Sequence, residues 1–281
     1  AGLGTRLLPL TKNIPKEILP IFYRSKNQIK PIPTIQVIFE QLYNCKLRNF
    51  CFVTNNEKNI VKDHFNFKKK SNKYFPNNTI VDEFNKKIDA SSITWITQNI
   101  PKGFGDAVKR SEKYVANDDL IVHGGDVSIF SKKIHPINRL IKTAKLNPNA
   151  SIILLCKKVK DTSRYGVPKI SLISKELFEV DEVVEKPSKP KSSYAIMPIY
   201  FFKPEIFSYL NKIKRGKNNE FQLTDAIQKT IEYGNKVLAI PMKSYDVDLD
   251  VGTPESYKHA LDASYKCCLL YTSPSPRDKR Q

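Results

Sequence analysis

Residues 1–17 read AGLGTRLLPLTKNIPKE, and this stretch places two glycines ahead of hydroxyl and basic side chains. Glycine leaves its backbone N–H group uncovered, so the peptide can approach a ligand closely. Backbone amides and side-chain cations together bind polyphosphates. The stretch therefore predicts a nucleotide-phosphate site. Its expected nucleotide contacts are Ala1, Gly2, Gly4 and Thr5, and its expected cations are Arg6 and Lys16.

The glycine spacing excludes the two commonest phosphate-binding loops. A dinucleotide-binding fingerprint requires a third glycine where Leu7 stands, and a P-loop requires Lys then Ser or Thr directly after its last glycine. The pattern that remains is Gly-x-Gly-Thr-Arg, with Pro15-Lys16-Glu17 following it. This long pattern resembles the sugar-nucleotide pyrophosphorylases, and most of all the bacterial and archaeal UTP–glucose-1-phosphate uridylyltransferases.

The composition indicates a globular protein with a large core. The 281 residues are 40% hydrophobic, the mean hydropathy is −0.42, and no apolar run approaches the length of a membrane span. The five cysteines show no C-x-x-C spacing. Free thiols in a reducing cytoplasm are the simplest interpretation, so we expect a cytoplasmic protein.

The net charge of +19 raises the question of nucleic-acid binding. The lysines are scattered, and the short basic runs at 68–70, 186–191 and 212–217 fall in expected loops without interleaved aromatic residues. Base stacking needs such aromatic residues. We therefore expect solvated loops and no nucleic-acid partner.

Apolar runs alternate with segments of helical periodicity along the chain. Runs such as 50–54, 120–123 and 152–156 are nearly continuous in apolar residues, which is typical of strands covered on both faces. We therefore expect an α/β fold with a Rossmann-like, mostly parallel mixed sheet flanked by helices. The resemblance implies that the less regular second half holds a small β-rich sugar-binding subregion.

A single nucleotidyltransferase domain is expected over residues 1–267. Its nucleotide-binding half would span about 1–130 and its sugar-phosphate-binding half about 131–267. Because a glycine loop of this kind normally follows a buried strand, the first strand is expected to be missing before Ala1. Residues 268–281 change abruptly to Ser, Pro and charged residues, and we expect them to be a non-native tail.

Gln98 follows a predicted strand at 93–97, and Gly103-Phe104-Gly105-Asp106-Ala107 opens the next helix. An amide side chain and bare backbone at the carboxyl edge of a sheet can bind the hydrogen-bonding edge of a base. An ordinary helix start is the alternative. The resemblance assigns Gln98 and Gly103 to the nucleobase, but Asp106 replaces a family histidine, so the base selectivity stays open.

Asp126 ends an apolar strand after two glycines, and Asp250 lies in the turn Asp250-Val251-Gly252-Thr253. Carboxylates exposed at a sheet edge suit Mg²⁺, which would bridge phosphate oxygens. The resemblance makes Asp126 a metal ligand, and Asp250 would present a second carboxylate. Asp246 and Asp248 are nearby competitors for that role.

Glu185 and Lys186 stand at the end of an extended segment, where Glu185 can accept sugar hydroxyls and Lys186 can pair with a phosphate. An exposed loop is the alternative. The family's Glu-Lys-Pro motif matches here, Glu-x-Gln-Leu-Thr-Asp matches at 220–225, and Tyr165-Gly166 resembles a turn beside the sugar. Met197-Pro198 replaces an expected glycine, which predicts a different pocket shape.

The resemblance implies Mg²⁺-dependent transfer of a uridylyl group from UTP to glucose 1-phosphate, which gives UDP-glucose and pyrophosphate. Arg6, Lys16 and Lys186 would be the catalytic cations. The end at 250–254 looks closer to thymidylyltransferases, so dTTP is the alternative nucleotide. An inactive nucleotide-sugar-binding regulatory module is the non-enzyme alternative. The resemblance also implies a homo-oligomer, either a dimer or a tetramer, and no membrane partner.

Overall fold

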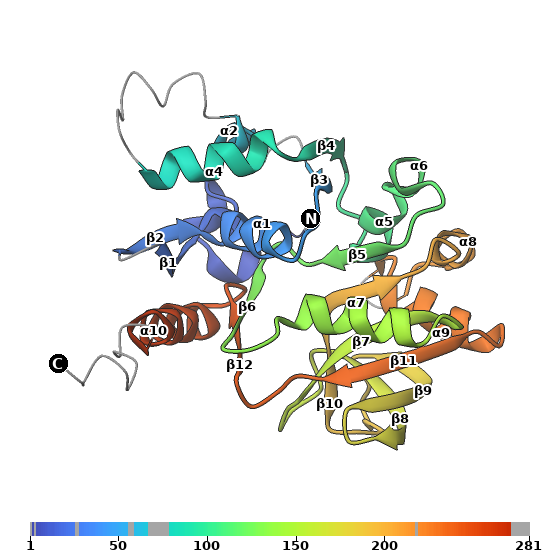
Figure 1. Ribbon diagram of the computed structural model, residues 1–281. Helices are drawn as coiled ribbons and strands as arrows, with labels where there is room; N and C mark the ends of the chain where they lie inside the picture. Colours follow the sequence, from blue (N-terminus) through green and yellow to red (C-terminus); the bar gives the residue numbers. More distant parts are fainter. Residues whose placement is uncertain are drawn as a thin grey trace.

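The fold is α/β, with a mixed central sheet flanked by helices (Figure 1). The computed structural model describes residues 2, 4–25, 28–55, 59–66, 79–216 and 219–270. Six strands form the central sheet in the order β5-β10-β7-β11-β9-β8. Their bounds are Leu120–His123 (β5), Ala150–Lys158 (β7), Gly166–Ser174 (β8), Leu177–Glu185 (β9), Tyr194–Phe202 (β10) and Lys236–Pro241 (β11).

The mixed α/β architecture is confirmed, but parallel pairing is less frequent than expected. Within the central sheet only β7 and β11 pair in parallel, and the other four ladders are antiparallel. Strand β10 runs antiparallel between β5 and β7, and β8 and β9 form a hairpin. The expectation of a mostly parallel central sheet was therefore wrong. An apolar run indicates that a strand is buried on both faces, but it does not indicate whether the adjacent strands run parallel or antiparallel to it.

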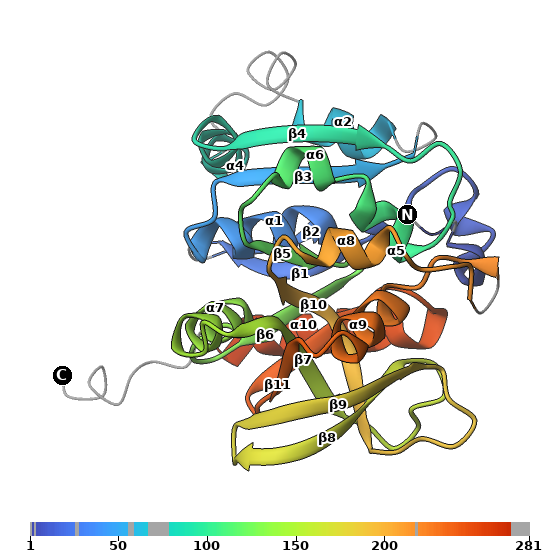
Figure 2. The same ribbon diagram turned by 90° about the vertical axis from the view of Figure 1, so that its right-hand side faces the viewer.

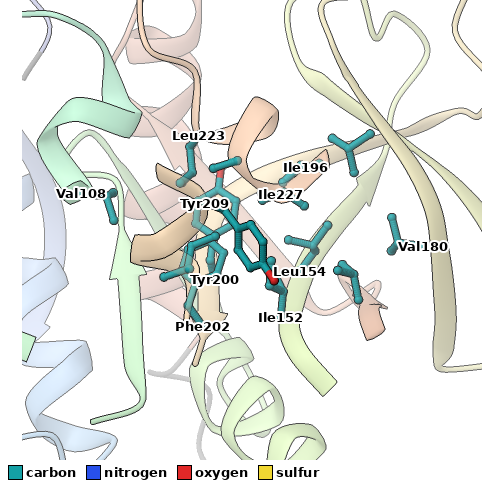
Figure 3. Packing of buried hydrophobic residues seen from close by; sticks show 14 of the residues in the cluster. Val108, Ile152, Leu154, Val180, Ile196, Tyr200, Phe202, Tyr209, Leu223 and Ile227 are labelled. Atoms are coloured by element: carbon teal, nitrogen blue, oxygen red, sulfur yellow. The ribbon is translucent and has the colours of Figure 1, made fainter. Parts of the chain in front are cut away.

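Helices on both faces bury the central strand β7. Its residues from Ala150 to Cys156 are all buried. Alternate side chains point to opposite faces of a strand, so Ile152 and Leu154 join one core cluster while Ile153 and Leu155 join another. The first cluster packs under α8 (Ile206–Leu210) and α9 (Leu223–Glu232), as Figure 3 shows, and the second packs against α7 (Pro136–Leu146).

A separate parallel pair, β3 (Asn49–Thr54) and β4 (Ser92–Thr97), lies beside the central sheet (Figure 2). Aromatic side chains dominate its packing: Phe39 contacts Phe50, Phe65 and Phe84. The helices that carry this cluster are α1 (Thr34–Asn44), α2 (Asn59–Phe65) and α4 (Thr79–Asp89). Two short helices, α5 (Phe104–Lys109) and α6 (Glu112–Val115), follow β4.

Two antiparallel pairs complete the fold. These are β1 (Pro20–Ser25) with β2 (Gln28–Pro33), and β6 (Val127–Ser131) with β12 (Asp246–Asp250). The pairing of β12 with β6, and of β10 with β5, joins residues after 130 to residues before it. The two predicted halves therefore share sheets within one structure.

The last described helix, α10 (Pro254–Leu270), packs on β1 and β12. Cys268 is 1% exposed, and its carbonyl accepts a hydrogen bond from Arg24 at 3.2 Å. The packed helix therefore continues past the boundary expected at residue 267, while residues 271–281 lie outside the described part. No helix in the described ranges is both long enough and apolar enough to cross a membrane.

Candidate functional site

The glycine loop turns tightly and presents a cation to solvent. Gly4 has φ of +70°, a left-handed conformation that favours glycine. Thr11 Oγ1 donates a hydrogen bond to Gly4 O at 2.7 Å, which ties the loop back on itself. Thr5 and Arg6 follow in a short 3-10 turn with exposed side chains. Gly2 is also exposed, whereas the predicted contact of Ala1 lies outside the described residues.

Lys16 pairs with Asp126, 110 residues further along the chain. Both side chains are mostly buried, at 17% and 26% exposure. Burial lowers the pKa of Lys16, but Asp126, Glu17 and Asp250 together raise that pKa above its ordinary value. Lys16 therefore stays charged, and the structure brings two of the predicted site residues into direct contact.

The ladder between β6 and β12 places Asp250 beside Asp126. Asp250 lies opposite Val127 in the register, and Val251 N donates to Asp126 O at 3.0 Å. Burial and the neighbouring Asp126 charge raise the pKa of Asp250, while Gly252 N donates to its Oδ1 at 2.8 Å. The two carboxylates and one lysine therefore form a single charged cluster.

The competing aspartates on β12 are already paired with cations. Asp246 has a fully buried side chain and binds Arg139. Asp248 pairs with Lys157 at 2.6 Å. Of the three β12 carboxylates, Asp250 therefore lies in the cluster with Asp126.

The two carboxylates of the cluster are the kind of donor that a hard divalent cation takes. Among the described residues there is no group of three or more His, Cys, Asp or Glu side chains that could hold a metal alone. Mg²⁺ in nucleotide sites takes one or two carboxylates and completes its coordination with phosphates and water. Asp126 and Asp250 match that requirement, and the Lys16 ammonium offsets part of their negative charge in the structure.

Gln98 is fully buried, and its amide orientation is determined by its partners. Gln98 Nε2 donates to Asp106 Oδ2 at 2.7 Å and to Gly103 O at 3.3 Å. A carboxylate only accepts hydrogen bonds, so the amide NH₂ group must face Asp106. Asp106, which departs from the family pattern, thus contacts the residue expected to bind the base.

Position 103 requires glycine because the backbone of Phe221 lies close to it. Its φ is +109°, and a Cβ atom there would lie 2.6 Å from Phe221 O. Gly105 N donates to the same oxygen at 2.9 Å. The glycine segment expected at the base therefore packs directly on residues 220–225, the other motif of the resemblance.

The predicted sugar-phosphate residues come together at the end of the β8–β9 hairpin. Gly166 lies opposite Glu185 in the register, and Lys186 N donates to Tyr165 O at 2.9 Å. Glu185 Oε1 lies 3.3 Å from Lys186 Nζ, and its Oε2 accepts a hydrogen bond from Thr224 Oγ1 at 2.9 Å. Glu185 is therefore held by two partners in a largely buried position.

Strand β10 connects the two halves of the site. Ile196 packs against Gly166, where a Cβ atom would lie 3.5 Å from Ile196 Cδ1. Pro198 O accepts a hydrogen bond from Gly124 N at 2.7 Å. The register of β10 on β7 shifts between Ile196 and Tyr200, around the proline. Sequence reasoning missed this positioning role of Pro198. The sequence feature that could have indicated this role is a proline inside a predicted strand, because such a proline marks an irregularity in the strand.

Comparisons with known proteins identify the family. A family model described as "Nucleotidyl transferase" matches residues 1–266. The chain is 34% identical over 234 residues to a UTP–glucose-1-phosphate uridylyltransferase of Staphylococcus epidermidis strain RP62A, and this match covers 82% of the chain and 78% of that protein.

Two solved structures of UDP-glucose pyrophosphorylase share the fold, each at 28% identity over 95% of this chain and 96% of theirs. The apo structure gives a TM-score of 0.83, and the complex with UDP-glucose gives 0.80. The family model covers nearly the whole chain and the curated relative exceeds 30% identity. On these grounds, and with Lys16, Asp126 and Asp250 brought together, the chain belongs to the nucleotidyl transferase family.

Proposed function

We propose that this protein transfers a uridylyl group from UTP to glucose 1-phosphate, with Mg²⁺ as cofactor. The observation that carries the proposal is a pair of charged groups, Lys16 with Asp126 and Asp250, and Glu185 with Lys186, whose neighbouring residues both contact strand β10. A two-substrate site needs a place for each phosphate, and the two groups supply one each. The activity named for the relatives supports the choice of substrates.

The reaction requires alignment of two anions and no protein nucleophile. A phosphate oxygen of glucose 1-phosphate attacks the α-phosphorus of UTP, the bond to the bridging oxygen breaks, and pyrophosphate leaves with the electron pair. Lys16 holds the α-phosphate, and the exposed Arg6 holds the leaving pyrophosphate. Cations placed where charge develops lower the barrier. Mg²⁺ on Asp126 and Asp250 would supply further neutralisation of phosphate charge.

On the acceptor side, Lys186 holds the phosphate of glucose 1-phosphate and Glu185 accepts hydrogen bonds from the sugar hydroxyls. Thr224 and Lys186 hold the Glu185 carboxylate in place. A pre-positioned carboxylate loses little side-chain entropy when the sugar binds. Homo-oligomer formation stays a prediction. Cytoplasmic location also stays a prediction, and the five free thiols are compatible with a reducing compartment.

The test of this function is pyrophosphate release from UTP, dTTP, ATP and GTP, each with glucose 1-phosphate and Mg²⁺. We expect the highest kcat/KM with UTP. Preference for dTTP would support the thymidylyl alternative, and nucleotide binding without turnover would support the regulatory module. Omission of Mg²⁺ and addition of EDTA should abolish release.

Replacing Glu185 with glutamine should raise the KM for glucose 1-phosphate about tenfold and change the KM for UTP little. A hydrogen bond to a charged group contributes about 1.5 kcal/mol, which corresponds to that factor. Steady-state kinetics with each substrate varied in turn measures the difference. Glu179→Gln is the matched control because Glu179 lies on the same strand, β9, with its side chain exposed. Equal KM values for parent and Glu185→Gln would contradict the assignment.

A further inference from the structure

A polar network links the end of β4 to helix α5, into which the chain turns after that strand (Figure 2). Gln98 follows β4, and its Nε2 donates hydrogen bonds to Asp106 Oδ2 at 2.7 Å and to Gly103 O at 3.3 Å. Arg110 Nε donates to the same Asp106 oxygen at 3.0 Å. The Asp106 carboxylate therefore joins the Gln98 amide to a cation four residues further along the chain.

The network admits one orientation of the Gln98 amide. The amide nitrogen carries two hydrogens, and it has two acceptors, Asp106 Oδ2 and Gly103 O. The reversed amide would place Oε1 against these two oxygens, neither of which can donate a hydrogen bond. Because Gln98 is fully buried, water cannot relieve that repulsion. Oε1 is therefore the atom that the amide presents on its other edge.

Asp106 stays ionised in this position. Burial raises the pKa of Asp106, but the hydrogen bonds from Gln98 and Arg110, together with the charges of Arg110 and Lys102, hold that pKa below its ordinary value. An ionised carboxylate only accepts hydrogen bonds. The direction of the bond between Gln98 and Asp106 is therefore fixed at neutral pH.

Gly103 connects this network with the cavity that contains the Lys16 ammonium. Gly103 lines the same cavity as Gly2 and Lys16. Gly103 O accepts from Gln98 Nε2 and also from Ala107 N at 3.2 Å, so both of its lone pairs are used. A side-chain carbonyl oxygen also has two lone pairs, so Gln98 Oε1 is suited to accept an N–H group from a nucleobase.

The pyrimidine bases differ at ring atom N3. Uracil and thymine carry an N3–H donor, whereas N3 of cytosine is an acceptor. An oxygen acceptor therefore attracts the first two bases and repels the third. A site built to hydrogen-bond one group rejects an analogue that lacks that group strongly, because its own buried polar atom is then left unpaired. Gln98 Oε1 thus favours uracil and thymine over cytosine, and it does not separate UTP from dTTP.

We propose that Asp106 is a positioning residue that determines base selectivity, because its carboxylate holds the Gln98 amide with Oε1 toward the base. The proposal rests on the base-binding role of Gln98 within the proposed function. It adds the group that decides which atom of that amide meets the base.

Isothermal titration calorimetry tests the proposal through the Kd values for UTP and CTP, each with Mg²⁺ and without glucose 1-phosphate. We expect the parent to bind CTP about thirtyfold more weakly than UTP. Asp106→Asn has nearly the same shape, but its amide can donate to Gln98, so the reversed orientation of Gln98 becomes accessible. The ratio of the CTP Kd to the UTP Kd should then fall about tenfold. Glu112→Gln is the matched control, with the same chemical change at an exposed carboxylate of α6, and should keep the parent's ratio.

The ratio separates positioning from a structural role. A structural defect alone weakens both nucleotides alike, so a parent-like ratio in folded Asp106→Asn would overturn the proposal. Equal affinities of the parent for UTP and CTP would also overturn it. Asp106→Ala removes the acceptor and should lower the ratio in the same direction, which keeps the test decisive if Asp106→Asn does not fold. A lowered ratio would support the proposal even in a protein that releases no pyrophosphate, so the test is separate from that of turnover.

Discussion

Replacing Lys16 with alanine should lower kcat for nucleotidyl transfer by about a hundredfold or more. The proposed mechanism uses this ammonium group to neutralise the α-phosphate as the fifth bond forms, and loss of one such group costs a few kcal/mol at the transition state. Lys16 is suited to the role because its pKa lies above the ordinary value despite burial. Single-turnover measurements with saturating UTP and glucose 1-phosphate would report the effect on chemistry.

Lys16→Ala also removes the cation that pairs with Asp126 and offsets part of the negative charge of Asp126 and Asp250. Loss of a partner from a largely buried carboxylate costs about 1–3 kcal/mol, so the melting temperature should fall by several degrees. Lys16→Arg keeps the charge and should retain more activity than the alanine variant. Lys30→Ala, an exposed lysine on β2, is the control and should match the parent in both measurements. Turnover of folded Lys16→Ala within a few-fold of the parent would refute the role.

The charged cluster was predictable because its residues stand in short motifs that can be read from the sequence. Lys16 follows Pro15 in the opening stretch, Asp126 ends an apolar strand, and Asp250 opens a glycine turn. Asp126 follows one strand and Asp250 ends another, and side chains from distant segments meet where strands end at the edge of a sheet. The sequence thus indicated that they would converge, and in the structure Lys16, Asp126 and Asp250 lie together. Their roles in binding and catalysis stay predictions.

The contacts that hold the site together were not predictable in the same way. The hydrogen bond from Thr224 to Glu185 and the packing of Gly103 on Phe221 join segments far apart in the chain. They depend on which strands pair and in which direction, and an apolar run does not encode that choice. The positioning role of Pro198 also depends on the antiparallel placement of β10.

Replacing Asp126 with asparagine should have the second large effect, a loss of about a hundredfold in kcat together with a higher Mg²⁺ requirement. Asparagine keeps the size of the side chain and the backbone carbonyl that accepts from Val251 N at 3.0 Å, so the β6–β12 connection persists. It removes one of the two carboxylates that fit a phosphate-bound Mg²⁺. Half-maximal activity should therefore need at least tenfold more Mg²⁺ than in the parent.

Asp126→Asn separates the metal role from a purely structural one through three measurements. We expect kcat to fall, the Mg²⁺ requirement to rise and the pKa of Asp250 to change. The pKa of Asp250 should fall, since the neighbouring negative charge that helps to raise it is gone. Asp248→Asn, on the same strand but paired with Lys157, should leave both kcat and the Mg²⁺ requirement unchanged. The Asp126→Asn variant could instead show a lowered kcat with the Mg²⁺ requirement of the parent. Asp126 would then act by positioning Lys16 through the Lys16–Asp126 ion pair and not by binding the metal.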